Sequence, residues 1–268
     1  MAAISLAVLY SQNRFEAGVA LPNIPAGVTA LAATPGLEGY FAIDSHNLEL
    51  LRIDGAGRVT NRFGGWGVDD QSLDLPVDLD LAENSIFVLD QGKRQIMRFD
   101  LRLNLVGTTP LDADLLPVSF ARDAQQRFWV ACRDRAGLFL YDDFGILLGF
   151  VGNEASGERL ISAPGRISAG AGSIAVIDDA QATVHIIDLS GSHVATVPFE
   201  IKGIITGFVW TDELLAISSE HRIKFMNTAT KWSSVIDIEP TIQGLSLVQG
   251  ALLVWDAGGR LFEYPLPD

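Results

Sequence analysis

Cysteine is nearly absent from this chain. Cys132 is the single cysteine among 268 residues. One thiol cannot build a disulfide framework, a CxxC pair or a cysteine-based zinc site. Because Cys132 lies in the apolar run WVAC, we expect a buried and chemically inert thiol.

Basic residues are also scarce. The 19 Lys and Arg residues are outnumbered by 33 Asp and Glu residues, which gives a formal net charge of −14. Nucleic-acid binding gains affinity from basic side chains that neutralise phosphates, so we expect no RNA or DNA partner. An acidic surface also repels anionic membranes. A basic protein partner or a cation remains compatible with this charge.

Long apolar runs are missing as well. No stretch reaches the roughly 18–20 apolar residues of a membrane-spanning helix, so we expect no transmembrane segment. The segment Ala2–Tyr10 is apolar, but no Lys or Arg precedes it, and it lacks the charged start of a secretory signal. The sequence does not identify the cellular compartment, and export to a periplasmic or extracellular location would require a signal that has been removed.

A repeated pattern dominates the rest of the sequence. An apolar run, then Asp or a substitute, a polar turn and a second apolar run recur in six copies, each typical of a β-hairpin. The six hairpins are expected near residues 41–54, 87–100, 129–142, 175–188, 215–227 and 253–265.

Further strands flank each hairpin. One precedes it, in several copies directly after a proline, and another follows in all copies except the last. Four strands in about 40–45 residues form one blade of a β-propeller. We therefore expect an all-β, single-domain protein spanning residues 1–268, a six-bladed β-propeller of four-stranded antiparallel blades.

The last copy is one strand short, because the chain stops at Asp268 soon after the hairpin. We expect an N-terminal strand within residues 3–10 to complete this blade. Joining the two ends of the chain in one blade closes the ring and removes exposed sheet edges.

The stretch RFGGWGVDDQSLDLPVDLDLAENSIFVLDQGKRQIMRFD carries a more specific signature. It combines a Phe-Gly turn, a spaced glycine, a proline before the inner strand, and two strands that end in aspartate. These residues are Phe63, Gly64, Gly67, Pro76, Asp90 and Asp100. In this pattern the chain resembles the NHL-repeat propellers, with a weaker match from Gly149 to Gly170. The resemblance runs from about Gly27 onward; it implies the propeller fold but not a function, because such propellers include enzymes, scaffolds and RNA binders.

Aspartates recur at both ends of the hairpins. Because nearly every copy has them, we expect them to accept hydrogen bonds in turns and not to form a catalytic ring. These aspartates are Asp44, Asp90, Asp178 and Asp256 at one end, and Asp54, Asp100, Asp142 and Asp188 at the other. Copy three has Cys132 and copy five has Ser218 at the first position, where Asp134 and Ser219 are candidates to rebuild the turn.

The innermost strands offer a candidate ligand site. Aligning the copies places Asp78, Asp80 and Arg166 at positions of the central channel where other blades keep small residues. Those small residues are Gly27 and Thr29, Ser119 and Ala121, Ser168, and Gly244 and Ser246. Buried charge is costly unless it is paired or bound to a ligand. An internal ion pair, a hydrated channel and a site for a cation or small ligand all remain open.

The turns of the hairpins supply a second candidate surface. They should emerge on one face together with the inter-blade loop, and an Arg and Trp combination suits a protein-binding hot spot. The candidates for this interaction face are His46, Trp66, Arg94, Arg133, Arg135 and His221. A solvated face of mixed charge is the alternative.

No convergent catalytic set is visible. The four histidines lack metal-ligand spacing such as HExxH; they are His46, His185, His193 and His221. The run AGAGS precedes a strand and not a helix, so a turn is expected there instead of a phosphate loop. The family resemblance implies metal-dependent hydrolases or lactonases as relatives, but those take channel ligands from several blades, and here the carboxylates come from one.

From the sequence we therefore expect a non-enzymatic interaction or scaffold module with a protein partner, within a larger assembly or alone, without a cofactor and without assigned catalytic or metal-binding residues. The alternative is a metal-dependent propeller hydrolase or lactonase, or a small-ligand binder, that uses Asp78, Asp80 and Arg166 in the central channel.

Overall fold

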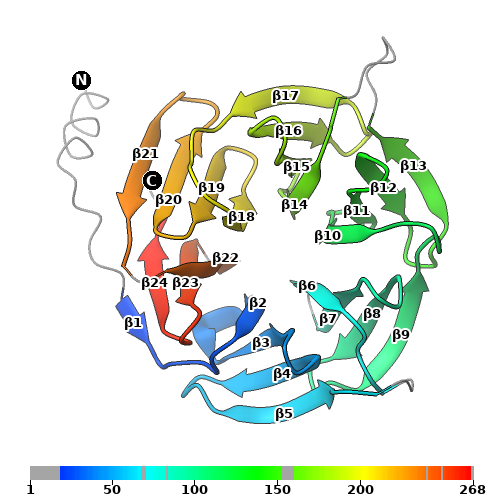
Figure 1. Cartoon of the computed structure of the whole chain (residues 1–268), viewed down its shortest axis with the longest axis vertical. Helices are drawn as coiled ribbons and strands as arrows, with labels where there is room; N and C mark the ends of the chain where they lie inside the picture. Colours follow the sequence, from blue (N-terminus) through cyan, green and yellow to red (C-terminus); the bar gives the residue numbers. More distant parts are fainter. Residues whose placement is uncertain are drawn as a thin grey trace.

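The computed structural model describes residues 19–67, 71–82, 84–152, 160–239, 241–248 and 250–266. Six four-stranded antiparallel sheets are arranged around a central axis like the blades of a propeller (Figure 1). This confirms the all-β, six-bladed architecture expected from the repeats. No helix in the described part is long and apolar enough to cross a membrane.

Each blade is built from the axis outward. The innermost strands are β2 (Val28–Ala33), β6 (Pro76–Ala82), β10 (Pro117–Arg122), β14 (Pro164–Ala169), β18 (Ile205–Trp210) and β22 (Ile242–Val248). The second strands are β3 (Gly39–Asp44), β7 (Ser85–Asp90), β11 (Phe128–Cys132), β15 (Ser173–Asp178), β19 (Leu214–Ser219) and β23 (Ala251–Asp256). A short 3₁₀ turn, η1 (Pro35–Leu37), joins β2 to β3.

The outer half of each blade is more exposed. The third strands are β4 (Glu49–Asp54), β8 (Gln95–Asp100), β12 (Gly137–Tyr141), β16 (Thr183–Asp188), β20 (Arg222–Asn227) and β24 (Leu261–Pro265). The outermost strands are β5 (Val59–Gly64), β9 (Leu105–Pro110), β13 (Leu147–Val151), β17 (His193–Pro198), β21 (Ser233–Asp237) and β1 (Val19–Leu21).

The distribution of apolar residues explains why each strand lies at its distance from the axis. Every residue of β3 and β7 is buried, because neighbouring blades cover both faces of a second strand. On β5 and β9 only one residue each is buried. The contacts between blades are aromatic and aliphatic; the rings of Phe63 and Phe99, for example, meet edge to face with centroids 4.7 Å apart. Full burial of such a side chain contributes about 1.5–3 kcal/mol.

The repeated aspartates cap turns, as the repetition predicted. Asp90 accepts hydrogen bonds from the N–H groups of Asp74, Leu75 and Lys93 at 2.9–3.1 Å. At the other end of the same hairpin, Asp100 accepts the N–H groups of Arg102 and Asn104. These carboxylates lie at hairpin ends, and none of the eight is among the described residues that line the channel.

The copies that lack the first aspartate rebuild the turn differently. In blade three, Asp134 accepts the N–H of Leu116 at 2.9 Å, which replaces the bond that Leu75 donates to Asp90 in blade two. In blade five, strand pairing places Ser219, and not Ser218, at the position of the aspartate. The substitute Asp134 was therefore correctly predicted from the sequence.

The ring closes where the chain ends meet. Strand β1 pairs with β24 and supplies the fourth strand of the sixth blade, as Figure 1 shows. The closing strand is thus Val19–Leu21, and the expected segment, residues 3–10, lies outside the described residues. Two bonds reinforce the junction: Ile24 N–H donates to Gly259 O at 2.8 Å, and Trp255 Nε1–H donates to Val28 O at 3.1 Å.

Candidate site in the central channel

A cavity of about 250 Å³ lies among the innermost strands, close to the axis of the propeller. All six of these strands contribute to its wall. Its polar and charged lining residues are Thr29, Asp78, Asp80, Ser119, Arg122, Arg166, Ser168, Thr206 and Ser246. The structure therefore brings together the three channel residues proposed from the sequence.

Strand register shows how unusual these charges are. Each innermost strand has a register shift near its start, and the residue two positions after the first paired residue of the strand lies level with Asp78. The equivalents of Asp78 are Ala30, Ser119, Arg166, Gly207 and Gly244. Blades two and four alone among these put an ionisable side chain at this level, as the alignment of the copies predicted.

The alignment was wrong in blade one. It placed Gly27 and Thr29 level with Asp78 and Asp80, whereas the register places Ala30 and Ala32 there. The physical reason is that Pro25 precedes the strand by several residues, and Val28 occupies the position that Pro76 has in blade two.

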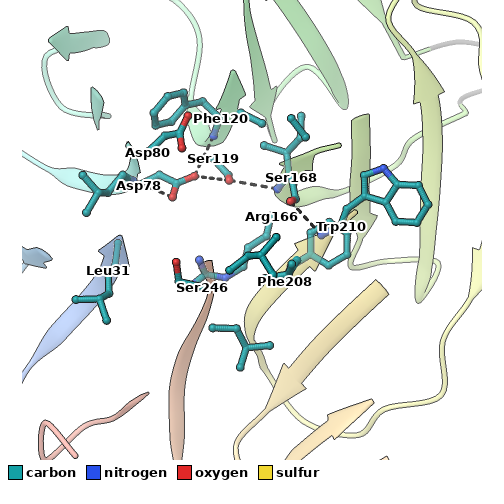
Figure 2. A pocket seen from close by; sticks show the side chains of 18 of the residues that line it. Leu31, Asp78, Asp80, Ser119, Phe120, Arg166, Ser168, Phe208, Trp210 and Ser246 are labelled. Carbon is teal, nitrogen blue, oxygen red and sulfur yellow. Dashed lines mark hydrogen bonds between the residues drawn. The ribbon is translucent and has the colours of Figure 1, made fainter. Parts of the chain in front are cut away.

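Asp78 is held by the next blade. Its Oδ2 accepts the Ser119 hydroxyl at 2.5 Å and the Phe120 N–H at 3.0 Å, and its Oδ1 accepts the Leu79 N–H at 2.9 Å (Figure 2). Burial raises the pKa of Asp78, while the Ser119 hydrogen bond and the positive charge of Arg166 act in the opposite direction. Asp78 is thus an anchored acceptor that links blades two and three.

Asp80 accepts fewer hydrogen bonds than Asp78, which accepts three. Burial, and then the nearby charge of Asp78, raise its pKa from the ordinary 3.8 to about 6; the Leu81 N–H and the charge of Arg122 oppose this rise. Within the described part of the chain, no other side chain donates a hydrogen bond to Asp80. A carboxyl of this kind changes protonation state near neutral pH.

Arg166 reaches into the cavity from blade four, which one blade separates from these acids, and Figure 2 shows its side chain extending into the open space. No hydrogen bond or ion pair joins its guanidinium to any residue that the structure describes. Asp179, at the turn beside it, pairs with Arg133 at 2.7 Å and feels the charge of Arg166 only at longer range. Arg166 therefore presents an unused cation to whatever fills the cavity.

Arg122 is a fourth charged residue of the wall, and sequence reasoning missed it. Its side chain is 9% exposed, and its guanidinium lies 4.6 Å from the centre of the Phe87 ring. One end contacts Gln126 at 3.2 Å and Asp143 at 3.4 Å, but the buried Nε has no hydrogen-bond partner in the described structure. The sequence feature that could have identified Arg122 is its position at the end of the inner strand β10. The alignment of the copies stopped one residue earlier, at Ala121.

The candidate interaction face is largely neutralised by its own acids. Arg133 pairs with Asp179, and Arg135 pairs with Asp114 and Asp134. The guanidinium of Arg94 donates to Leu115 O at 3.2 Å. The three remaining candidates are exposed, most of all Trp66 at 79%; they are Trp66, His46 and His221.

Other motifs have structural roles. The AGAGS run wraps around Asp212, which accepts bonds from the Ala171 and Gly172 N–H groups and from the Ser173 hydroxyl at 2.6 Å. His185 is buried on β16 beside Thr183 and Thr196 and is not among the residues that line the cavity. Among the described residues, no group of three or more His, Cys, Asp or Glu side chains could hold a metal ion.

Comparison with known proteins defines a class of fold. No family model and no curated protein sequence matches the chain. Among solved structures, a streptogramin B lyase is similar with a TM-score of 0.63 and 13% identity, over 94% of this chain and 86% of that chain. At this identity the similarity shows a shared six-bladed propeller fold and nothing finer.

Two further structures are of virginiamycin B lyase from Staphylococcus aureus. A catalytically inactive histidine-to-alanine variant with quinupristin has a TM-score of 0.62 at 11% identity and covers 93% of this chain and 87% of that one. The selenomethionine-substituted protein has a TM-score of 0.61 at 12% identity, with 94% and 88% coverage.

These comparisons contradict the sequence-based expectation of a non-enzymatic interaction or scaffold module, because the propellers that this chain resembles are enzymes. The expectation rested on the lack of a convergent catalytic set in the sequence, and the basic turns were only its candidate contact face. The structure shows two of those arginines, Arg133 and Arg135, paired with aspartates. The alternative, an enzyme or small-ligand binder that uses the channel, agrees better with the findings.

Proposed function

We propose that this protein is a propeller enzyme that binds a small polar molecule in the central cavity and transfers a proton to or from it through Asp80. The observation that carries the proposal is the convergence, in one cavity, of Asp80 and the unpaired guanidinium of Arg166. The lyase names of the structural neighbours support an enzyme over a scaffold.

The two sides of the cavity have different tasks in this proposal. Asp80 exchanges the proton, since a group whose pKa lies near the working pH can both donate and accept efficiently. Arg166 binds and orients an electron-rich group of the substrate. Asp78 keeps the wall of the cavity rigid, because Ser119, Phe120 and Leu79 already occupy its oxygens.

A metal-dependent version of this enzyme fits the residues less well. Hard cations prefer six or more oxygen ligands, and here two carboxyls of one strand face two guanidiniums. Asp78 is also engaged in three hydrogen bonds. We derive no step through a metal.

We also propose that the repeats are of the NHL type. The Phe-Gly, Pro and Asp pattern of blade two supports this part of the proposal.

A substrate screen with two variants tests the proposal. Lyase and hydrolase substrates, quinupristin among them, are offered to the wild type, to Asp80→Asn and to Asp237→Asn. Asp237 is a suitable control because its side chain is 75% exposed on the outermost strand β21. Loss of a general acid or base lowers kcat about 10²–10⁴-fold, so we expect this loss in Asp80→Asn alone. Equal turnover by Asp80→Asn and the wild type would overturn the proposal.

A further inference from the structure

The cavity holds charges of both signs in equal number. Asp78 and Asp80 come from blade two, Arg122 from blade three and Arg166 from blade four. Within the described chain, no ion pair joins either aspartate to either arginine; the influence of Arg166 on Asp78 and of Arg122 on Asp80 acts over longer distances. The four groups thus surround a space that none of them fills.

Two of these groups retain unused capacity. The guanidinium of Arg166 has no hydrogen-bond partner among the described residues, whereas Arg122 pairs with Asp143 and its unpartnered Nε is too deeply buried for a guest to reach. Asp80 receives no hydrogen bond from another described side chain. Buried polar groups without partners are costly, so a guest that supplies these partners gains binding energy.

The sign of the charges restricts the guest. A guest that is only an anion would satisfy Arg166 but would add negative charge beside Asp78 and Asp80. A guest that is only a cation would satisfy Asp80 but would leave Arg166 unpaired. A zwitterion presents the required group to each side, and its net charge of zero preserves the balance of the cavity.

The volume of the cavity and the apolar part of its wall restrict the guest further. A volume of about 250 Å³ lies below the roughly 300–1,000 Å³ of sites for drug-sized ligands. Leu31, Phe208, Leu245 and Leu247 contribute apolar surface to the same wall. A compact guest with one short apolar group matches both properties.

From this geometry we infer that the cavity binds a small zwitterionic amino acid, with its carboxylate on Arg166, its ammonium facing Asp80 and a short apolar side chain against Leu31 and Phe208. The inference rests on the proposed function and names its substrate class. No contact with the loop face around Trp66 is required.

Three probes of nearly equal shape test it. L-leucine carries both charges, 4-methylpentanoate carries only the carboxylate, and 3-methylbutylamine carries only the ammonium. Their affinities are measured by isothermal titration calorimetry at pH 7.5 on the wild type. Each charged hydrogen bond contributes about 1.5–3 kcal/mol, so we expect L-leucine to bind about 10- to 100-fold more tightly than either partial probe.

Two variants assign the charges to residues. Asp80→Asn should lower the affinity for L-leucine and leave the affinity for 4-methylpentanoate unchanged or higher. Arg166→Leu should also lower the affinity for L-leucine but leave the affinity for 3-methylbutylamine unchanged. These opposite selectivities cannot arise from misfolding, because each variant retains one probe. Asp237→Asn should bind all three probes like the wild type.

The outcomes are distinct from those of the function test. Equal affinities for the three probes, or no heat with any of them at millimolar concentration, would overturn the inference. If a neutral substrate is meanwhile turned over in an Asp80-dependent manner, the proposed enzyme function stands and only the substrate class is wrong. If L-leucine binds but no substrate is converted, the binding site stands and the catalytic role of Asp80 falls.

Discussion

The Ser119 hydroxyl donates a 2.5 Å hydrogen bond to Asp78 Oδ2 and at the same time accepts the Ile167 N–H at 3.2 Å. Blades two, three and four are therefore linked through one hydroxyl at the wall of the cavity. A comparable bond follows further around the ring, where Ser168 Oγ accepts the Trp210 N–H at 3.1 Å. Polar side chains of the inner strands thus hold neighbouring blades in register where the ligand is proposed to bind.

Removing this hydroxyl should destabilise the protein measurably. Ser119→Ala leaves the Ile167 N–H and one bond of Asp78 unsatisfied, and an unsatisfied buried group costs about 1–3 kcal/mol. Chemical denaturation at pH 7 should show a loss of that size. The matched change Ser233→Ala, at an exposed position of β21, should stay within about 0.5 kcal/mol of the wild type. Equal stability of both variants would show that the link contributes nothing.

The raised pKa of Asp80 predicts a specific pH dependence of stability. Native Asp80 keeps its proton up to about pH 6, whereas the unfolded chain releases it near pH 4. The native state binds more protons between these values, so stability falls as pH rises through this window. Asp80→Asn should therefore be more stable than the wild type at pH 7.5, by up to about 2–3 kcal/mol.

The measurement is urea denaturation of the two proteins at a series of pH values from 4 to 8. Their difference should shrink towards pH 4, where Asp80 is protonated in the folded state and about half protonated in the unfolded state. A constant difference over the whole range would contradict the raised pKa. Asp237→Asn, at a position 75% exposed on β21, is measured at the same pH values as the control.

Closure of the ring can be tested with two glycines that share the same backbone conformation. Gly259 has φ of +83° and Gly250 has φ of +81°. A Cβ on Gly259 would clash with Ile24 O, whereas a Cβ on Gly250 meets nothing described within 4 Å. Both alanine variants therefore carry the strain of a positive φ, about 1–3 kcal/mol, and only Gly259→Ala also disrupts the junction between the chain ends.

We expect thermal denaturation to show a much larger loss for Gly259→Ala, more than about 4 kcal/mol, which is the size seen for changes that break a packed contact. If both variants lose the same stability, the junction at Ile24 does not support the ring.

Binding of L-leucine should also depend on pH. Asp80 holds the ammonium only when it is ionised, so the affinity should fall as pH drops below about 6. The other charged groups at the cavity are Asp78, Arg122 and Arg166, with Asp143 and Asp179 behind the arginines. Calorimetry at pH 5 and pH 7.5 measures the change. An affinity that rises on acidification would contradict the assignment of the ammonium to Asp80.

The fold could be predicted from the sequence because its cause is repeated. Six copies of a buried strand that ends in aspartate establish the blade, and substitutes such as Asp134 were recognisable by their proximity. The closing strand could not be located, since Val19–Leu21 is too short to show a period-two pattern. Blade one was misaligned because Pro25 lies outside the strand, and a proline is a marker of strand position only where pairing begins with it.

The site was predicted in part. Asp78, Asp80 and Arg166 deviate from a repeated pattern of small residues, and such deviations are visible in one sequence. Arg122 does not deviate in an obvious way, because the end of an inner strand varies from blade to blade. The ion pairs of the loop face could not be predicted, because the pairing of Arg133 with Asp179 crosses between blades and sequence spacing does not reveal that contact.

A crystal structure of the protein soaked with L-leucine, or with the first substrate found in the screen, tests the central claim most directly. We predict density in the axial cavity, between Asp80 and the guanidinium of Arg166. Density on the loop face beside Trp66 and Arg133, with the cavity holding only water, would contradict it.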